Sequence, residues 1–183
     1  MKKLLCVFAL MMACFIMGTT TSYINAGAKV SVSSVRKQCS TKSKALKYMT
    51  KVNIKVWDLS RGKKVTRTKT VVVNKAIASN VKKAFQKIYN GKEKFPIHEI
   101  SGFDWRGSTK SLHSIGLAID INWSENYMVV GSQVLCGELW KPGKNPYSIP
   151  KKGDVQKALR KYGLKQCIWG SRKDYMHFSI GGL

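Results

Sequence analysis

Two short segments that alternate between apolar and polar residues constrain the fold of this chain more than any other feature. The first runs from Gly116 to Asn122, and its apolar residues are Leu117, Ile119 and Ile121. The second runs from Tyr175 to Ile180, and its apolar residues are Met176, Phe178 and Ile180. Successive side chains of a strand point to opposite faces, so each segment predicts a strand with one apolar and one polar face. Asp120 lies on the polar face of the first strand and His177 on that of the second.

The residues around these strands are of the types that bind zinc. His113 lies seven residues before Asp120, and Asp174 lies three residues before His177. Zinc binds His nitrogen and carboxylate oxygen, and a catalytic zinc keeps three protein ligands and one open position. We therefore expect one Zn²⁺ per chain, held by His113, Asp120 and His177, with Asp174 as the base that takes a proton from water. Composition alone would favour unrelated core or surface positions for these residues, and the strand pattern raises the odds of a site.

The two motifs also resemble those of a known family. The segment Ser111–Asp120 reads S-x-H-x-x-G-x-A-x-D, and Asp174–Phe178 reads D-x-M-H-F. Together they resemble the D-alanyl-D-alanine carboxypeptidase family of zinc peptidases, which has the hedgehog/DD-peptidase fold. The likeness extends from about Val52 to the C-terminus. Family members often carry W-G-G-x-W and a longer spacer before the second motif, whereas here Trp169–Lys173 leads directly into Asp174. This departure from the family pattern affects the rim of the substrate cleft rather than the metal ligands.

The resemblance implies roles for two further residues. Arg106 would orient the substrate or stabilise the oxyanion that forms at the scissile carbonyl, tasks that suit a fixed guanidinium. Ser111 would hydrogen-bond a substrate carboxylate. Without the resemblance, Arg106 reads as one more surface cation and Ser111 as a turn residue.

The remaining patterns predict an α+β domain with a small, mainly antiparallel sheet and helices packed on one face. A hairpin is expected from 52–56 and 66–73, and further strands from 97–103, 117–122 and 175–180. Asn74 is a candidate N-cap for a helix that ends at Asn90-Gly91, and Asp154 for a second helix closed by Gly163. Residues 131–144 are expected to form a loop near the cleft.

The N-terminus resembles an export signal. Lys2 and Lys3 precede an uncharged apolar stretch, and Ala26-Gly27-Ala28 supplies a cleavage pattern. We expect a signal peptide at 1–28, a lead-in segment at 29–51 whose Ser- and Lys-rich part (29–43) is mobile, and a peptidase domain at 52–183. The protein would then be secreted or held in the cell envelope, without a stable membrane span. An uncleaved anchor is the alternative.

The charge of the chain indicates polyanionic partners. Lys and Arg number 33 against 9 Asp and Glu, a formal net charge of +24. Combined with an export signal, this favours anionic cell-wall polymers over nucleic acid, for which no motif is present. A generally solvated basic surface explains the charge equally well. Cleavage would leave Cys39, Cys136 and Cys167, whose pairing the sequence leaves open.

The favoured function is a zinc-dependent D-alanyl-D-alanine carboxypeptidase that acts on peptidoglycan stem peptides. The alternatives are an endopeptidase of the L-Ala-D-Glu type and a non-catalytic, cationic protein that binds the cell envelope. Asp174 argues against the last, because a binding module has no need of a base three residues from a metal ligand.

Overall fold

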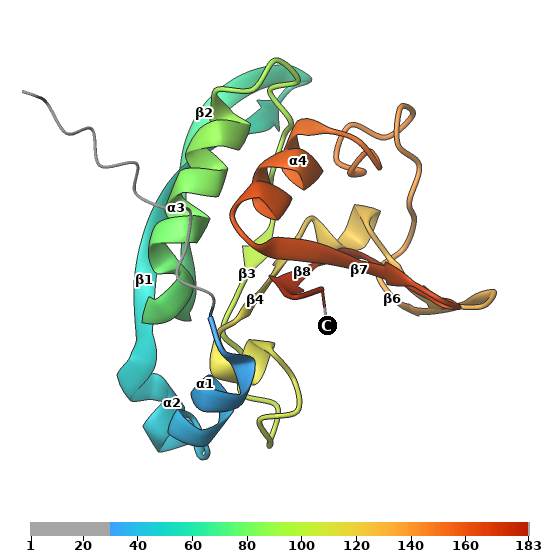
Figure 1. Cartoon of the computed structure of the whole chain (residues 1–183). Coiled ribbons are helices and arrows are strands. Elements are labelled where there is room, and N and C mark those ends of the chain that lie inside the picture. The colour runs from blue at the N-terminus through green and yellow to red at the C-terminus, as the bar shows by residue number, and fades with distance from the viewer. Residues whose placement is uncertain (1–29, 183) are drawn as a thin grey trace, which may run out of the picture.

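The computed structural model describes residues 30–182, so the expected signal peptide lies outside the described residues. Two antiparallel sheets make up the strand structure of this part (Figure 1). A ribbon of β1 (Met49–Ser60) and β2 (Lys63–Asn74) forms one. The other has the order β3-β4-β8-β5-β6, with β7 also paired to β8. Its strands are β3 (Ile100–Ser101), β4 (Ala118–Ile121), β5 (Met128–Val130), β6 (Gln133–Cys136), β7 (Leu164–Trp169) and β8 (Arg172–Ile180). The expected α+β class is confirmed.

The two expected helices form and build the core between the sheets. Helix α3 (Lys75–Tyr89) begins where the Asn74 side chain accepts a hydrogen bond from the amide of Ala76. Its buried residues recur at helical spacing and contact β1; they are Ile77, Val81, Ala84, Phe85 and Ile88. Helix α4 (Asp154–Lys161) packs on α3 and β7. The prediction of Asp154 as its cap is wrong: Gly153 is the N-cap, and the Asp154 carboxylate instead accepts from the amide of Glu93.

The expected mobile lead-in is folded. Residues 32–38 form α1 (Val32–Gln38) and residues 42–48 form α2 (Lys42–Tyr48). The hydroxyls of Ser31 and Thr41 cap these helices by accepting from backbone amides. The Ser and Thr residues that suggested an irregular segment are therefore the start signals of helices, each too short to show a periodic apolar face. Within residues 30–182, no helix is long and apolar enough to cross a membrane.

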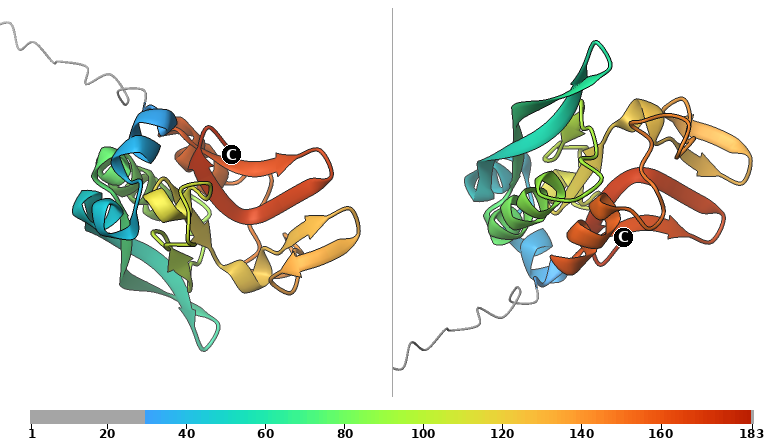
Figure 2. Two further views of the ribbon diagram at one scale, coloured as in Figure 1. Left: turned by 90° about the horizontal axis from the view of Figure 1, so that it is seen from below. Right: turned by 90° about the horizontal axis from the view of Figure 1, so that it is seen from above.

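Two other expectations are only partly met. The segment 97–103 contributes just the two residues of β3. Residues 131–144 include β6, which pairs with β5 in a hairpin that projects beside the β7–β8 hairpin (Figure 2). The rest of that segment is loop, held down where the ring of Trp140 stacks on Tyr175 with centroids 3.8 Å apart. The β5–β6 and β7–β8 hairpins both project from the rest of the molecule (Figure 2).

Candidate metal centre

Strands β4 and β8 bring the first two predicted ligands together. They pair antiparallel, with Asp120 directly opposite His177 and Ala118 opposite Ser179. Side chains opposite one another in such a pair lie on the same face. The small Ala118 and Ser179 leave room beside the ligands, while Ile119 and Phe178 face the core and are fully buried. The expected polar faces of the two strands therefore form one surface.

His113 reaches this surface from a short 3₁₀ helix, η1 (His113–Ile115), just before β4. The turn between them depends on Gly116, whose φ is +67°. A Cβ at this position would lie 2.6 Å from the backbone nitrogen of Asn74, at the end of β2. Glycine is needed both for the left-handed conformation and for this close approach. The segment before β4 is thus fixed against the ribbon, and it aims His113 at Asp120.

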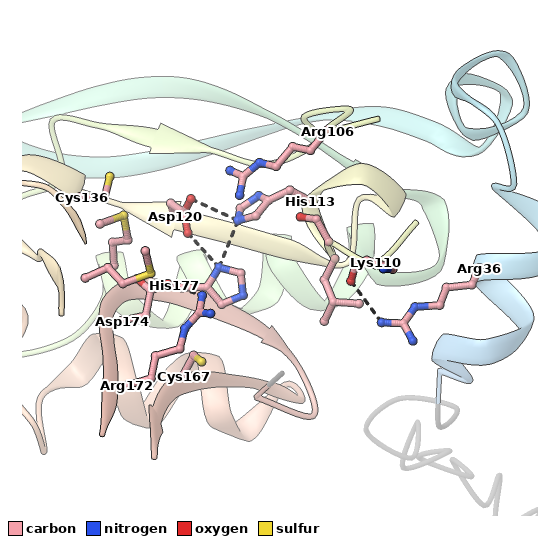
Figure 3. Close-up of a pocket in the computed structure, with 14 residues that line it drawn as sticks. Arg36, Arg106, Lys110, His113, Asp120, Cys136, Cys167, Arg172, Asp174 and His177 are labelled. Carbon is pink, nitrogen blue, oxygen red and sulfur yellow. Dashed lines mark hydrogen bonds and ion pairs between the residues drawn. The ribbon is translucent and has the colours of Figure 1, made fainter. Parts of the chain in front are cut away.

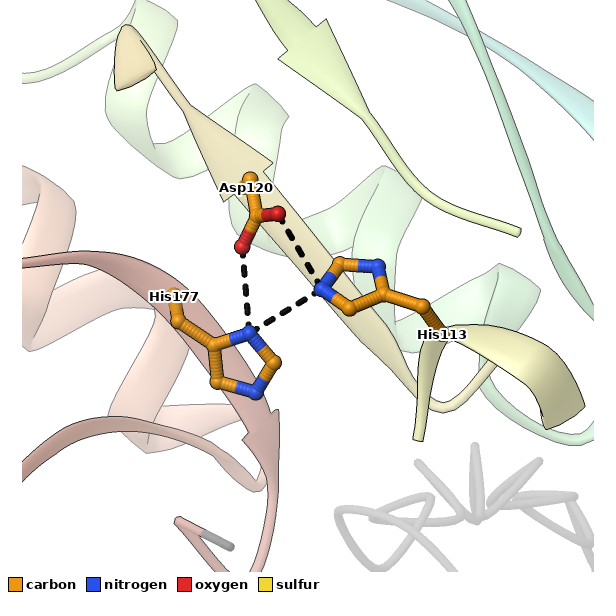
Figure 4. A group of neighbouring side chains, drawn as sticks. All are labelled: His113, Asp120 and His177. Carbon is orange, nitrogen blue, oxygen red and sulfur yellow. Dashed lines mark hydrogen bonds and ion pairs between the residues drawn. The ribbon is translucent and has the colours of Figure 1, made fainter. Parts of the chain in front are cut away.

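The three candidate ligand side chains form a triangle in which each contacts the other two (Figure 4). Nε2 of His113 lies 3.0 Å from Nδ1 of His177 and 3.1 Å from an oxygen of Asp120, and Nδ1 of His177 lies 3.0 Å from the other oxygen. In a tetrahedral zinc site with bonds of 2.0–2.1 Å, ligand atoms are about 3.3–3.4 Å apart. Each contact of this triangle is therefore a few tenths of an ångström shorter than that separation, and Asp120 uses a different oxygen toward each histidine.

The ring of His113 is held in the form that a metal needs. Its Nδ1 lies 2.7 Å from the carbonyl oxygen of Gly102, which can only accept a hydrogen bond. The neutral ring therefore carries its proton on Nδ1 and presents the lone pair of Nε2 to Asp120 and His177. A backbone carbonyl that fixes the tautomer of a ligand in this way is a regular feature of metal sites. The residues thus fit a bound zinc ion.

The electrostatics of the triangle favour a cation. Burial would raise the pKa of Asp120, but the hydrogen bonds and charges of His113 and His177 outweigh burial and hold it well below its usual range. Burial would lower the pKa of His113, but the hydrogen bond and charge of Asp120, with the bond to Gly102, raise it overall. A buried carboxylate that is ionised and facing two imidazoles attracts positive charge, which a metal supplies.

Asp174 faces the same surface because β8 contains a bulge. Along β7, Gln166 pairs with Phe178 but the next residue, Cys167, pairs with Asp174, so β8 carries extra residues at this point. In a regular strand, residues three apart point to opposite faces. The bulge cancels this alternation, and both Asp174 and His177 line the same cavity. The strand expected at 175–180 therefore begins earlier, at Arg172, and Asp174 lies inside it.

The carboxylate of Asp174 is placed as a general base would be. The residue is buried, and within residues 30–182 its Oδ1 has no hydrogen-bond partner. The other oxygen lies 3.5 Å from the guanidinium of Arg172. Burial raises the pKa of Asp174, while the charges of His177 and Arg172 oppose the rise. A desolvated carboxylate with a free acceptor oxygen can bind a water and take its proton.

The cavity over these residues holds about 430 Å³ and has cationic walls (Figure 3). Both residues whose roles came from the resemblance, Arg106 and Ser111, line it. Arg106 donates from Nε to Asp104 at 3.0 Å, and its side chain is half exposed, so the guanidinium can turn toward a ligand. The structure brings all six predicted site residues to one cavity: Arg106, Ser111, His113, Asp120, Asp174 and His177.

Sequence reasoning missed part of the cavity wall. Arg36, from α1, donates to the carbonyls of Thr109 and Lys110 at 3.1 and 3.2 Å and so holds the loop that leads to His113. Its side chain lines the cavity together with Lys110 and Arg172. No motif could reveal Arg36, because its role depends on a contact with residues more than seventy positions away in the chain.

A row of paired residues crosses the sheet beside Asp174. Cys167 pairs with Asp174, Asp174 with Met128, and Met128 with Cys136. All four line the cavity. The two cysteines are thus three strand spacings apart, about 14 Å at 4.7–4.9 Å per strand. A disulfide requires Cα atoms within about 7 Å, so these two cysteines do not pair with each other.

Comparison with known proteins agrees with the site. Residues 105–180 match the family model described as D-alanyl-D-alanine carboxypeptidase. No curated protein and no solved structure matches the chain. The matched segment contains every residue of the proposed centre, whereas Arg36, the ribbon and α3 lie outside it. The family suggested by the motifs is confirmed for this segment.

Proposed function

We propose that this chain, whose residues 105–180 carry a D-alanyl-D-alanine carboxypeptidase domain, is an exported zinc peptidase that removes the terminal D-alanine from peptidoglycan stem peptides. One observation carries the catalytic part of the proposal. Asp174 is buried and lines the cavity beside His113, Asp120 and His177, and among residues 30–182 one of its carboxylate oxygens has no hydrogen-bond partner. A protein that only binds its ligand gains nothing from this desolvated carboxylate, which costs free energy to bury.

Each group of cavity residues has its own role in the proposed hydrolysis. Zinc held by His113, Asp120 and His177 would supply Lewis-acid polarisation of the scissile carbonyl and a water of lowered pKa. Asp174 accepts the proton of the attacking water and returns it to the leaving amine. Arg106 donates to the oxygen on which negative charge develops. Ser111 and Lys110, on the same wall, bind the C-terminal carboxylate of the substrate.

A second candidate, an endopeptidase of the L-Ala-D-Glu type, is favoured by cations on both sides of the centre. Arg106 lies beside His113, and Arg172 lies on the side of His177 (Figure 3). A carboxypeptidase substrate brings one carboxylate next to the scissile bond, whereas a D-Glu residue brings a further one. The second cation would suit this additional carboxylate.

Export and polymer binding complete the proposal. Support for export comes from the sequence of residues 1–28, and support for binding to anionic wall polymers comes from the net charge of +24. Both properties would bring the protein to the cell wall, where the proposed substrate is.

The test is incubation of the purified protein with defined muropeptides, with and without a chelator, and identification of the products by mass. Loss of one terminal alanine supports the carboxypeptidase, and cleavage between L-Ala and D-Glu supports the endopeptidase. An Asp174→Asn variant should be inactive in both assays. Glu93→Gln, a change of the same kind far from the cavity, serves as the control. No cleavage of any peptide by zinc-loaded protein would overturn the proposal.

A further inference from the structure

A second cluster of histidine and carboxylate side chains lies outside the cavity described above. It consists of His98, Glu99 and Glu125, and its three ligand atoms lie within 4.8 Å of one another. Nε2 of His98 is 2.8 Å from an oxygen of Glu125 and 3.9 Å from Oε2 of Glu99. The ligands of a tetrahedral zinc ion are about 3.3–3.4 Å apart, so one of these distances is shorter and the other longer than that separation by about half an ångström.

The charges of the cluster are paired with no Lys or Arg side chain. The chain contains 33 Lys and Arg, yet among residues 30–182 the only ion pairs of Glu99 and Glu125 are with His98. Oε2 of Glu99 is buried and has no hydrogen-bond partner in this part of the chain. Lys69 donates to the backbone carbonyl of His98, and its ammonium lies 3.9 Å from the carboxylate of Asp58. Two carboxylates that share one imidazole leave negative charge that a cation would neutralise.

The backbone around the cluster is fixed before any ion binds. The side-chain oxygen of Asn122 accepts from the amides of both His98 and Glu99, and its NH₂ group donates to the carbonyls of Pro96 and Tyr147. The ring of His98 packs on Tyr147 with centroids 4.2 Å apart. Glu125 lies in the short 3₁₀ helix η2 (Trp123–Glu125), directly after Asn122. Preorganised ligands reduce the entropy cost of binding.

We propose that His98, Glu99 and Glu125 form a second binding site, for a divalent cation of the zinc type. One imidazole and two carboxylates are a donor set that zinc accepts. The side chains are 30, 23 and 17% exposed, against 2% for His113, so the site is more open and binds more weakly than the catalytic centre. The ion would join the segment before β3 to the end of β4, the strand that carries Asp120, and would stabilise it.

The experiment counts zinc ions bound to the full mature protein, stripped of metal and free of any tag, by native mass spectrometry during a zinc titration. We expect two equivalents for the wild type, the second at higher free zinc. The double variant Glu99→Gln, Glu125→Gln should keep only the first. The control Glu93→Gln removes a carboxylate elsewhere and should keep both.

A variant of the catalytic centre separates the two proposals. His177→Ala should lose the first equivalent of zinc and retain the second. Adding Glu99→Gln and Glu125→Gln to this variant should then remove the second equivalent. Zinc beyond the first equivalent should raise the unfolding temperature of the wild type but not that of the double variant. Wild-type protein that never binds a second ion, or a double variant that still binds it, would overturn the proposal. Either result leaves the test of peptidase activity unaffected.

Discussion

The cavity and the ribbon with α3 use charge in opposite ways. At the metal centre the charged groups are buried and contact specific partners: His113 is 2% exposed, and Asp120 has contacts to both imidazoles. From Met49 to Asn90 the chain has eleven Lys and Arg but one acidic residue, Asp58. Most of these cations are exposed on β1, β2 and α3 (Lys51, Lys55, Arg61, Lys63, Lys64, Arg67, Lys75, Lys82, Lys83 and Lys87).

From this difference we expect the cavity to determine catalysis, and the ribbon with α3 to determine where the protein is retained. A buried charge interacts strongly with few partners, so changing one group should abolish one function. An exposed charge is screened by salt and acts only as part of a sum. We therefore expect single substitutions to matter in the cavity, and only combined substitutions to matter on the ribbon.

The largest effect is expected from His177→Ala. Removing one of three ligands should reduce bound metal at the catalytic centre from about one equivalent to none, and turnover should disappear with it. Metal analysis together with a peptide assay measures both, and circular dichroism checks that the variant is folded. Full metal occupancy in this variant would mean that the metal binds elsewhere.

Asp174→Asn should separate turnover from metal binding. The amide is nearly the same size but accepts no proton, so the catalytic rate constant should fall by about 10²–10⁴ while zinc stays bound. Rate measurements on zinc-loaded protein and metal analysis of the same sample test this. If the metal is lost as well, Asp174 is a ligand and not the base.

Arg106→Ala should lower the catalytic rate constant by roughly 10²–10³, the cost of removing one donor to a developing oxyanion. Arg106→Lys should restore only part of the rate, since an ammonium lacks the planar fork of the guanidinium. A raised Michaelis constant with an unchanged rate constant would assign Arg106 to binding of the substrate carboxylate instead.

The exposed cations of the ribbon and α3 should govern retention of the protein on wall polymers. Replacing Lys51, Lys55 and Lys82 together by Gln removes three exposed charges, so retention should weaken and depend less steeply on salt. Turnover of a small soluble peptide should stay the same in this triple variant. Retention on polymer columns at several salt concentrations, beside the peptide assay, tests both halves of the comparison. Equal salt sensitivity of retention and turnover would show that the basic residues act in the cavity.

The smallest effect concerns pH. Burial raises the pKa of Asp174, and the protonated form is no base, so activity should be lost as pH falls through a pKa above the usual carboxyl range. Arg172 opposes the rise, so Arg172→Gln should move the acidic limb of the pH profile to slightly higher pH. A shift to lower pH would mean that the limb reports a different group.

The sequence predicted elements whose signal is local. Helix α3 shows a helical period over fifteen residues, and β4 and β8 show a period of two beside their ligands. The helices α1 and α2 have seven residues each, too few for a period to be visible. The contact of Arg36 with Thr109 and Lys110 depends on tertiary packing, and so does the pairing of β7 with β8 that creates the bulge.

The predicted site residues lie together in the structure, whereas several elements of the fold were not predicted. All six predicted residues line one cavity, because ligand chemistry restricts residue type and spacing more tightly than packing does. The orientation of Asp174 could not be predicted, since it comes from the bulge in β8. The cluster of His98 with Glu99 and Glu125 was not predicted, because it depends on residues that the fold brings together.

The bulge in β8 limits how this site can be transplanted or redesigned. The carbonyl of Tyr175, within the bulge, accepts a hydrogen bond from the side chain of Gln166 on β7, so the irregular segment is anchored by its neighbour. A designer who copied Asp174 and His177 onto a regular strand would obtain the base on one side of a sheet and the ligand on the other. Deleting one residue between them would not restore activity either, because the pairing with β4 and β5 on the opposite edge would also change register. The unit that would have to be transferred is therefore the bulged strand with its neighbouring strands, and not the five-residue motif Asp174–Phe178 alone.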